Sequence, residues 1–206
     1  MKRQQIVLLA VLLILAGCGG SRPVVHQFFL LETPPGKAFE WPDNLHAIAG
    51  SCEVENVRVA PPYASHQIAV REDSHQLRFF TFNEWAVRPD QQLTQIVIDF
   101  FEEHHVFGSV MHGRIAERTD YVVETNVVHM ELDNRQDDFH ARLHVEFKLI
   151  SLADVDPVGV VHHVANRSEP LNEKNINEFA ATVSRLFMDE LHAFSTAFLN
   201  QAGDEQ

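Results

Sequence analysis

The sequence predicts a single α+β domain in which a mostly antiparallel sheet carries two main helices on one of its faces. Three observations predict this class. Several segments alternate between apolar and polar residues, two longer segments repeat apolar residues with helical spacing, and 206 residues suit one domain with a sizeable core. The order is strands, a helix, three more strands and a final helix, which favours helices packed against one side of an antiparallel sheet.

The expected domain, residues 26–200, opens with short strands separated by turn residues. Gln67–Arg71 and Gln76–Phe82 lie on either side of a turn at Asp73–Ser74, so we expect them to pair as a β-hairpin. Two earlier segments are also predicted to be strands: His26–Leu31, ended by Thr33–Pro34–Pro35–Gly36, and Cys52–Val59, ended by Pro61–Pro62.

The first helix is expected to run from Pro89 to about His104. Proline is favourable in the first turn because the N–H that it lacks has no partner there. The apolar residues of this segment recur with helical spacing and predict one buried face: Leu93, Ile96, Val97, Phe100 and Phe101. Gly108 lies just beyond the expected end of the helix.

Three strands are expected to follow as an antiparallel meander. Tyr121–Leu132 is rich in β-formers, and its apolar alternation changes parity midway, which indicates a bulge or burial on both faces. Phe139–Leu149 alternates without a fault, so one side is expected in the core and the other in solvent. Val158–Val164 supplies the third strand after Asp156–Pro157.

A long helix is predicted at the end of the chain. Asn172 is a candidate N-cap, and residues 201–206 are expected to form a polar tail. The apolar stripe of this helix is broad and continues for several turns: Ile176, Phe179, Ala180, Val183, Leu186, Phe187, Leu191, Phe194 and Phe198.

The first eighteen residues have the pattern of a secretory signal. Lys2 and Arg3 precede the apolar run Ile6–Leu15, and small residues lead to Cys18. The run is shorter than the about 20 residues that a membrane-spanning helix needs. The segment Leu15–Ala16–Gly17–Cys18 resembles the bacterial lipobox, in which the cysteine is lipidated and becomes the new N-terminus. We therefore expect a lipoprotein signal peptide at residues 1–17 and a lipidated tether at residues 18–25.

The signal predicts where the mature protein resides. One acyl chain binds a membrane only marginally, but a processed lipobox cysteine normally carries three, so residence at the membrane is expected to be permanent. By resemblance to bacterial sorting rules, Gly19 after Cys18 points to the periplasmic face of the outer membrane. The net charge of −13 argues against binding nucleic acid or anionic head groups, and favours proteins or neutral lipids as partners.

Motifs for catalysis or cofactor binding are absent from the sequence. No Gly-x-Ser-x-Gly motif, glycine-rich phosphate loop or Walker lysine occurs. Thirteen histidines raise the question of a metal, but neighbours such as His162 and His163 point to opposite faces of a strand. His140 and His144 share a face but are too far apart for one ion, and Arg142 stands between them. We expect no enzyme, no cofactor and no metal site.

Two further residues leave alternatives open. Cys52 is either a buried free thiol or the source of an intermolecular disulfide. Trp85 follows a predicted strand and precedes the Pro89 helix, so it either anchors the helix on the sheet or contacts a partner.

The ordered motifs resemble the ABC-type transport auxiliary lipoprotein family over roughly residues 26–195. The matching pieces follow Cys18 in order: Phe28–Leu31; Val57–Tyr63; Gln67–Arg71; Leu77–Phe79; and Asn83–Ala86 before a helix that opens near Leu93. The chain departs from the family at Phe28–Phe29, where tyrosine is usual, at Ser65–His66, and at Glu84. Tyr63 and Trp85 belong to these motifs and are candidates for a structural or partner contact.

The resemblance implies a non-enzymatic accessory protein. Such lipoproteins are components of systems that pair an MCE-domain protein with inner-membrane transport proteins and move phospholipid or another hydrophobic cargo between the membranes, which supports envelope integrity. Family members can form homo-oligomeric rings, and a ring would use exposed strand edges and helix faces. Two other hypotheses stay open: a structural or regulatory lipoprotein that activates or scaffolds a cell-wall or envelope complex, and a periplasmic hydrolase or metal binder.

Overall fold

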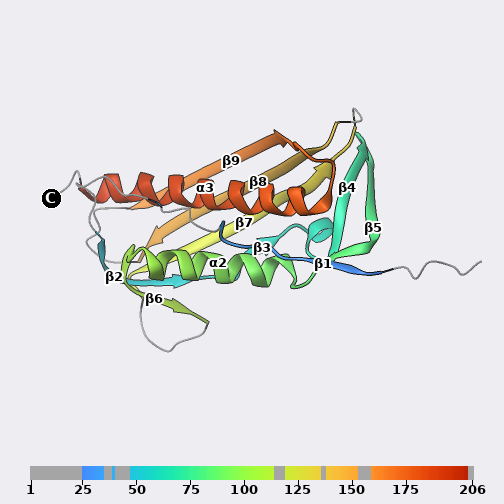
Figure 1. The fold of residues 1–206 in the computed structure, drawn as a ribbon. Helices are drawn as coiled ribbons and strands as arrows, with labels where there is room; N and C mark the ends of the chain where they lie inside the picture. Colours follow the sequence, from blue (N-terminus) through green and yellow to red (C-terminus); the bar gives the residue numbers. More distant parts are fainter. Residues whose placement is uncertain are drawn as a thin grey trace, which may run out of the picture.

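The computed structural model describes residues 25–34, 39, 47–113, 119–135, 138–152 and 159–203, and the fold is shown in Figure 1. The signal peptide, Cys18 and almost all of the tether lie outside the described residues. The helices and strands are β1 (Gln27–Phe29), β2 (Ile48–Val54), β3 (Arg58–Val59), η1 (Pro61–Tyr63), β4 (Gln67–Asp73), β5 (Gln76–Trp85), α2 (Pro89–Glu103), β6 (Phe107–His112), β7 (Tyr121–Asp133), β8 (His140–Ser151), β9 (Val160–Pro170) and α3 (Ile176–Gly203).

One curled sheet is built around the long strand β7. Along one edge β7 pairs antiparallel with β8, which pairs antiparallel with β9. Along the other edge it pairs in parallel with β2, β3 and β4 in turn. β6 and β1 add two more parallel pairs, beside β2 and β5, while β4 and β5 form the predicted antiparallel hairpin. The α+β class is confirmed, but the expectation of a mostly antiparallel sheet is wrong, because the sheet is mixed.

The physical reason for the mixed sheet is the path of the chain. Parallel strands need a long crossover connection, and here β5, α2 and β6 all lie between β4 and β7. β7 therefore returns alongside β2, β3 and β4 in the same direction that they run. These pairings join residues as distant in sequence as Cys52 and Tyr121, so no local pattern of the sequence reports them.

The meander β7–β8–β9 agrees with the prediction from alternation. Val145, Phe147 and Leu149 of β8 are fully buried on one face. The register of β7 against β8 shifts between Val127 and His129, which is the irregularity that the change of parity predicted. The opposite face of β8 is half-buried rather than open to solvent.

The structure corrects one strand prediction and adds one strand that was not predicted. The expected strand Cys52–Val59 is two strands, because the ladder is interrupted at residues 55–57 before β3 pairs with a later part of β7. β6 was not predicted, since Gly108 and Ser109 break the apolar pattern. A Cβ at position 108 would lie 3.0 Å from the carbonyl oxygen of Gly50, so glycine permits the close approach of β6 to β2.

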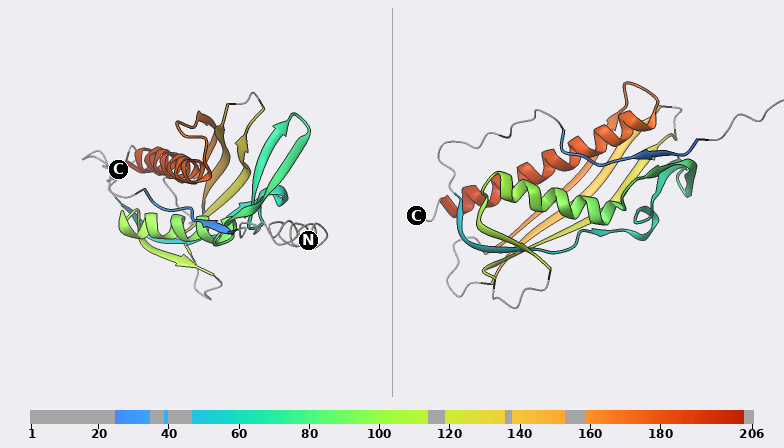
Figure 2. Two further views of the ribbon diagram at one scale, coloured as in Figure 1. Left: turned by 45° about the vertical axis from the view of Figure 1, so that its right-hand side comes forward. Right: turned by 60° about the horizontal axis from the view of Figure 1, so that its bottom comes forward.

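The two helices lie on the same side of the curled sheet and run side by side (Figure 2), with α3 over β8 and β9 and α2 over β2, β3 and β6. The core between them is rich in aromatic rings. Phe107 of β6 contacts both helices, with ring centroids 5.4 Å from Phe101 of α2 and 5.5 Å from Phe198 of α3. Phe147 of β8 lies 5.3 Å from Phe194. The two predicted apolar stripes are therefore the faces that these helices bury.

The structure identifies the residues at which the two helices begin. α2 begins with Pro89, as predicted. The cap of α3 is Asn175 and not Asn172, because the Asn175 side-chain oxygen accepts the backbone N–H of Glu178 at 2.8 Å. α3 continues to Gly203, through the first residues of the expected tail. Neither of the described helices is both long enough and apolar enough to span a membrane.

Candidate functional site

The N-terminal segment, residues 27–34, lies in the gap between the two helices and forms the wall of a groove. β1 pairs with the end of β5, and the chain then continues between α2 and α3 (Figures 1 and 2). The backbone N–H of Leu31 donates to Oε1 of Gln92 in α2 at 3.3 Å. The N–H of Glu32 donates to Oγ of Ser184 in α3 at 3.1 Å. Leu31 itself is buried, so this segment joins the two helices.

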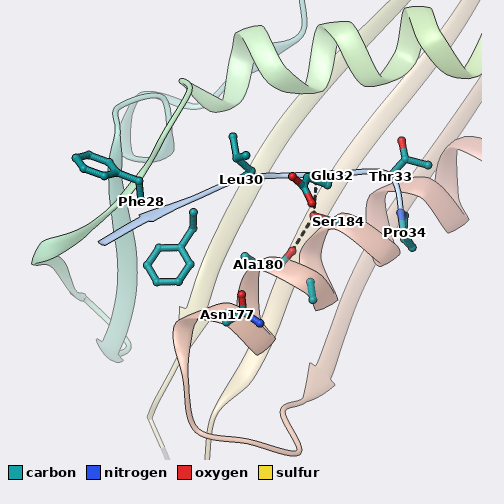
Figure 3. Close-up of a pocket in the computed structure, with 10 residues that line it drawn as sticks. Phe28, Leu30, Glu32, Thr33, Pro34, Asn177, Ala180 and Ser184 are labelled. Atoms are coloured by element: carbon teal, nitrogen blue, oxygen red, sulfur yellow. Dashed lines mark hydrogen bonds between the residues drawn. The ribbon is translucent and has the colours of Figure 1, made fainter. Parts of the chain in front are cut away.

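A groove of about 420 Å³ separates the N-terminal segment from the first half of α3 (Figure 3). Its lining mixes apolar and polar side chains from both walls. The residues on the segment side are Phe28, Phe29, Leu30, Glu32, Thr33 and Pro34, and those on α3 are Asn177, Ala180, Ala181 and Ser184. Among the described residues that line the groove, Glu32 supplies the one carboxylate, and none is a histidine or a cysteine. The chemistry of the groove suits the contact of a polypeptide or an apolar group.

Trp85 lies in the interior at the point where β1, β5 and α3 meet. It is 2% exposed, and its ring centroid is 6.0 Å from that of Phe179 in α3. Its backbone N–H donates to the carbonyl of His66 at 2.7 Å, and Nδ1 of His66 lies 2.8 Å from the Trp85 carbonyl oxygen. The neighbouring N–H of Ala86 donates to the carbonyl of Phe29. Trp85 thus packs the hairpin against α3 and has little surface to offer a partner.

Tyr63 is also buried, and its hydroxyl donates to Glu131 of β7 at 2.6 Å. The Glu131 side chain has no exposed surface. It accepts hydrogen bonds from Nε of Arg71 at 2.9 Å and from Arg142 at 2.9 Å. Burial by itself raises the pKa of Glu131, but the bonds from Arg71 and Tyr63 and the charges of the two arginines outweigh it and lower that pKa. Burial, followed by the bond to Glu131, raises the pKa of Tyr63 to about 12.

This Glu131 network ties η1, β4, β7 and β8 together. A carboxylate that accepts three donors and has its pKa lowered is held as a charged acceptor, so it is unsuited to act as a base. The network is therefore a structural joint at the junction of the hairpin and the meander. The sequence analysis did not single out Glu131. The available signal was a charged residue between Met130 and Leu132, two apolar residues that are both buried.

Several histidines take part in packing or ion pairs. His163 lies on the helix side of β9, with Nε2 2.8 Å from Glu190 of α3, whereas His162 is exposed on the other side. His144 stacks on His129 at 5.8 Å between ring centroids. Within the described ranges, no group of three His, Cys, Asp or Glu side chains is arranged to hold a metal ion.

Cys52 has no exposed surface, and burial raises the pKa of its thiol well above its ordinary range. A disulfide to another molecule requires access to the sulfur atom. The placement agrees with the alternative of a buried free thiol.

A cluster of exposed apolar side chains, not singled out from the sequence, lies beside the groove. Val25, Phe28 and Phe82 are 67%, 63% and 42% exposed. The His26 ring lies between the two phenylalanines, 6.5 Å from the ring of Phe28 and 5.4 Å from that of Phe82. We call Val25, His26, Phe28 and Phe82 the N-terminal aromatic patch. Its sequence signal was the excess of phenylalanine in two short strands, but only the register places those residues together.

Comparisons with solved structures place this fold among known proteins. Protein XCC0632 from Xanthomonas campestris superposes with a TM-score of 0.72 at 17% identity, over 87% of this chain and 98% of that one. An uncharacterized protein of known crystal structure gives a TM-score of 0.64 at 11% identity, over 84% and 98% of the two chains. At these identities the likeness concerns the fold alone. No curated protein matches the sequence at a significant level.

The family expected from the motifs is confirmed by its sequence profile. The profile of the ABC-type transport auxiliary lipoprotein component matches residues 30–191, which is most of the chain and includes Tyr63, Trp85, the Glu131 network and the α3 wall of the groove. Its description names an auxiliary part of a transport system and no enzyme class. The chain belongs to the ABC-type transport auxiliary lipoprotein family.

Proposed function

We propose that the protein is a periplasmic lipoprotein, anchored in the outer membrane through lipid on Cys18, that acts as a non-enzymatic accessory of an MCE-type phospholipid transport system. The observation that carries the proposal is the family match over residues 30–191 behind a lipobox-like segment. The described surface adds support, because its groove and patch are suited to contact and the buried carboxylate Glu131 is engaged by arginines. The accessory would dock the periplasmic end of the transport channel and so support envelope integrity.

We further propose that the protein assembles into a homo-oligomer, and a ring is the arrangement that its edges favour. In the described part of the sheet, β9 pairs only with β8 and β6 pairs only with β2. Val160 and Val164 of β9 are exposed beside the free edge. Two different edges on one chain permit a head-to-tail contact, which generates rings when the rotation closes.

The lipid anchor predicts the outcome of one substitution. Cys18→Ser removes the thiol that a thioether lipid requires, so the protein should lose all incorporation of an alkyne fatty-acid analogue and stay unprocessed at that site. The measurement is in-gel fluorescence of the labelled, immunoprecipitated protein together with its mass. Ser51→Ala serves as the control and should label like the wild type. Equal labelling of the Cys18→Ser protein would contradict the anchor.

The docking role predicts which neighbour the groove has in cells. A photo-crosslinking residue at Ala181, which is exposed on the α3 wall of the groove, should form an adduct with a protein that contains an MCE domain. The same residue at Val164 should give adducts of twice the mass of the chain if β9 is an oligomer edge. Mass spectrometry of the adducts from intact envelopes identifies the neighbour.

The matched control places the crosslinker at Asn200, which is exposed near the far end of α3. It should give neither adduct in comparable yield. An adduct at Ala181 with a cell-wall enzyme or its regulator, in place of an MCE-domain protein, would favour the alternative of a regulatory or scaffolding lipoprotein.

A further inference from the structure

We infer that the N-terminal aromatic patch rests on the lipid bilayer, at the boundary between head groups and acyl chains, and so fixes the orientation of the domain on the membrane. This inference rests on the proposed lipid anchor at Cys18. It adds a second membrane contact made by the folded domain itself, through Val25, His26, Phe28 and Phe82.

The strand register and the ring contacts place His26, Phe28 and Phe82 on one surface, and Val25 directly precedes His26 in the chain. β1 and β5 pair in parallel with Phe28 opposite Glu84, so Phe28, Phe82 and Glu84 project from the same side of the two strands. The ring contacts of His26 with both phenylalanines agree with this placement. Trp85 and Phe29 project from the other side, toward the core. Figure 3 shows the Phe28 side chain extending away from Ala180 and Asn177 of α3.

The position of the patch in the chain selects the bilayer as its occupant. Val25 belongs to the patch and is joined to Cys18 by residues 19–24 only. An extended chain spans at most about 3.3–3.6 Å per residue, so the patch cannot lie more than about 25 Å from the lipidated cysteine. Once the chain is anchored, the bilayer is present at a high effective concentration near the patch. A small apolar surface is then sufficient to keep the patch in contact with the bilayer.

The chemistry of the patch agrees with a shallow contact. Apolar side chains that are clustered and exposed mark an interaction surface, whereas single ones are ordinary. Binding at the interface increases with the apolar area buried among the lipids. Glu84 lies on the same side as Phe28, and its carboxylate is costly to move into hydrocarbon, which limits the depth to the head-group boundary. Because the chain has a net charge of −13, apolar burial and not electrostatic attraction has to drive the contact.

The test uses the full chain, expressed in bacteria, purified from their envelopes in detergent and reconstituted in phosphatidylcholine vesicles that contain a fraction of nitroxide-labelled phospholipid. Phe82→Cys is labelled with the environment-sensitive dye NBD. Cys52 has no exposed surface and stays unlabelled. Asn200→Cys, exposed near the opposite end of α3, carries the same dye in the control protein. Flotation of the vesicles reports the anchor independently of the dye.

We expect both proteins to float, the Phe82→Cys dye to shift to the blue, and its quenching by nitroxide to exceed that of the Asn200→Cys dye by about threefold or more, in low and high salt alike. Adding Phe28→Asp should reduce the quenching at position 82 by about half or more, because a charge opposes burial among the lipids.

Three results would overturn the inference. Flotation with equal, weak quenching at both positions would leave the anchor in place and remove the patch from the bilayer. A dye at position 82 whose emission shifts to the blue without quenching by nitroxide would contradict bilayer contact. Together with crosslinks between copies at that position, this result would assign the patch to a contact with a second copy of the chain. Absence of flotation would refute the anchor itself, and the patch contact with it.

Discussion

Leu143→Asp should unfold the domain or destabilise it by more than about 4 kcal/mol, which is a large share of a typical stability of about 5–15 kcal/mol. Leu143 is 1% exposed in the first half of β8, on the same face as Phe147, whose ring contacts phenylalanines of α3. The substitution removes a buried leucine and places an unpaired carboxylate among apolar side chains. The measurement is chemical and thermal denaturation of the full chain in detergent, followed by circular dichroism.

The matched control is His162→Asp on the adjacent strand. His162 is exposed on the opposite face of the sheet and pairs with Lys148, so an aspartate there meets solvent and a cation. Its effect should stay within about 0.5 kcal/mol. His144 is a poorer control, since its ring is half-buried against His129. Equal losses of stability at positions 143 and 162 would show that the assignment of the two faces is wrong.

Glu131→Gln is the second substitution with a large expected effect. It removes the charge between Arg71 and Arg142, so the partly buried Arg71 guanidinium loses its counter-ion and Arg142 keeps only the more distant Asp133, at 3.8 Å. Removing one partner of a buried ion pair lowers the stability of the fold by about 3–5 kcal/mol, because the other charge stays buried without an opposite charge beside it. The arginine side chains are 15% and 23% exposed, so we expect about 2–4 kcal/mol after screening by solvent.

Glu124→Gln is the control for this substitution, on the same strand and the same face. Its ion pair with Arg58 lies at 3.3 Å, and the Arg58 side chain is 62% exposed. Exposed pairs contribute about 0–1 kcal/mol, so the loss should be small. A Glu131→Gln protein as stable as the Glu124→Gln protein would mean that the network does not join the hairpin to the meander.

The stability difference between the wild type and the Glu131→Gln protein is also expected to depend on pH. The pKa of Glu131 lies below its ordinary value of 4.5 in the folded protein. Its contribution to stability is therefore fully present above that value and is lost as the pH falls through the folded pKa. The difference in stability between the wild type and Glu131→Gln should shrink as the pH is lowered below 4.5. A difference that is constant with pH would contradict a charged Glu131.

The elements whose signals are local could be predicted from the sequence. The periodicity of Leu93 to Phe101 and of Ile176 to Phe198 predicted both helices and the faces that they bury. The alternation of residues 139–149 predicted the central strand of the meander, and the change of parity in residues 121–132 predicted its irregular partner. The ordered motifs that include Tyr63 and Trp85 predicted the family, which the sequence profile confirms.

The tertiary structure decided what depends on residues far apart in the chain. Parallel pairing of β7 with β2, β3 and β4 made the sheet mixed, and the pairing of β6 with β2 turned Phe107–His112 into a strand. Glu131 gained its partners from β4, β8 and η1, and the N-terminal aromatic patch arose only when β1 was laid beside β5. Periodicity along a segment determines which face of that segment is buried, whereas a joint or a patch depends on which segments become neighbours in the folded chain.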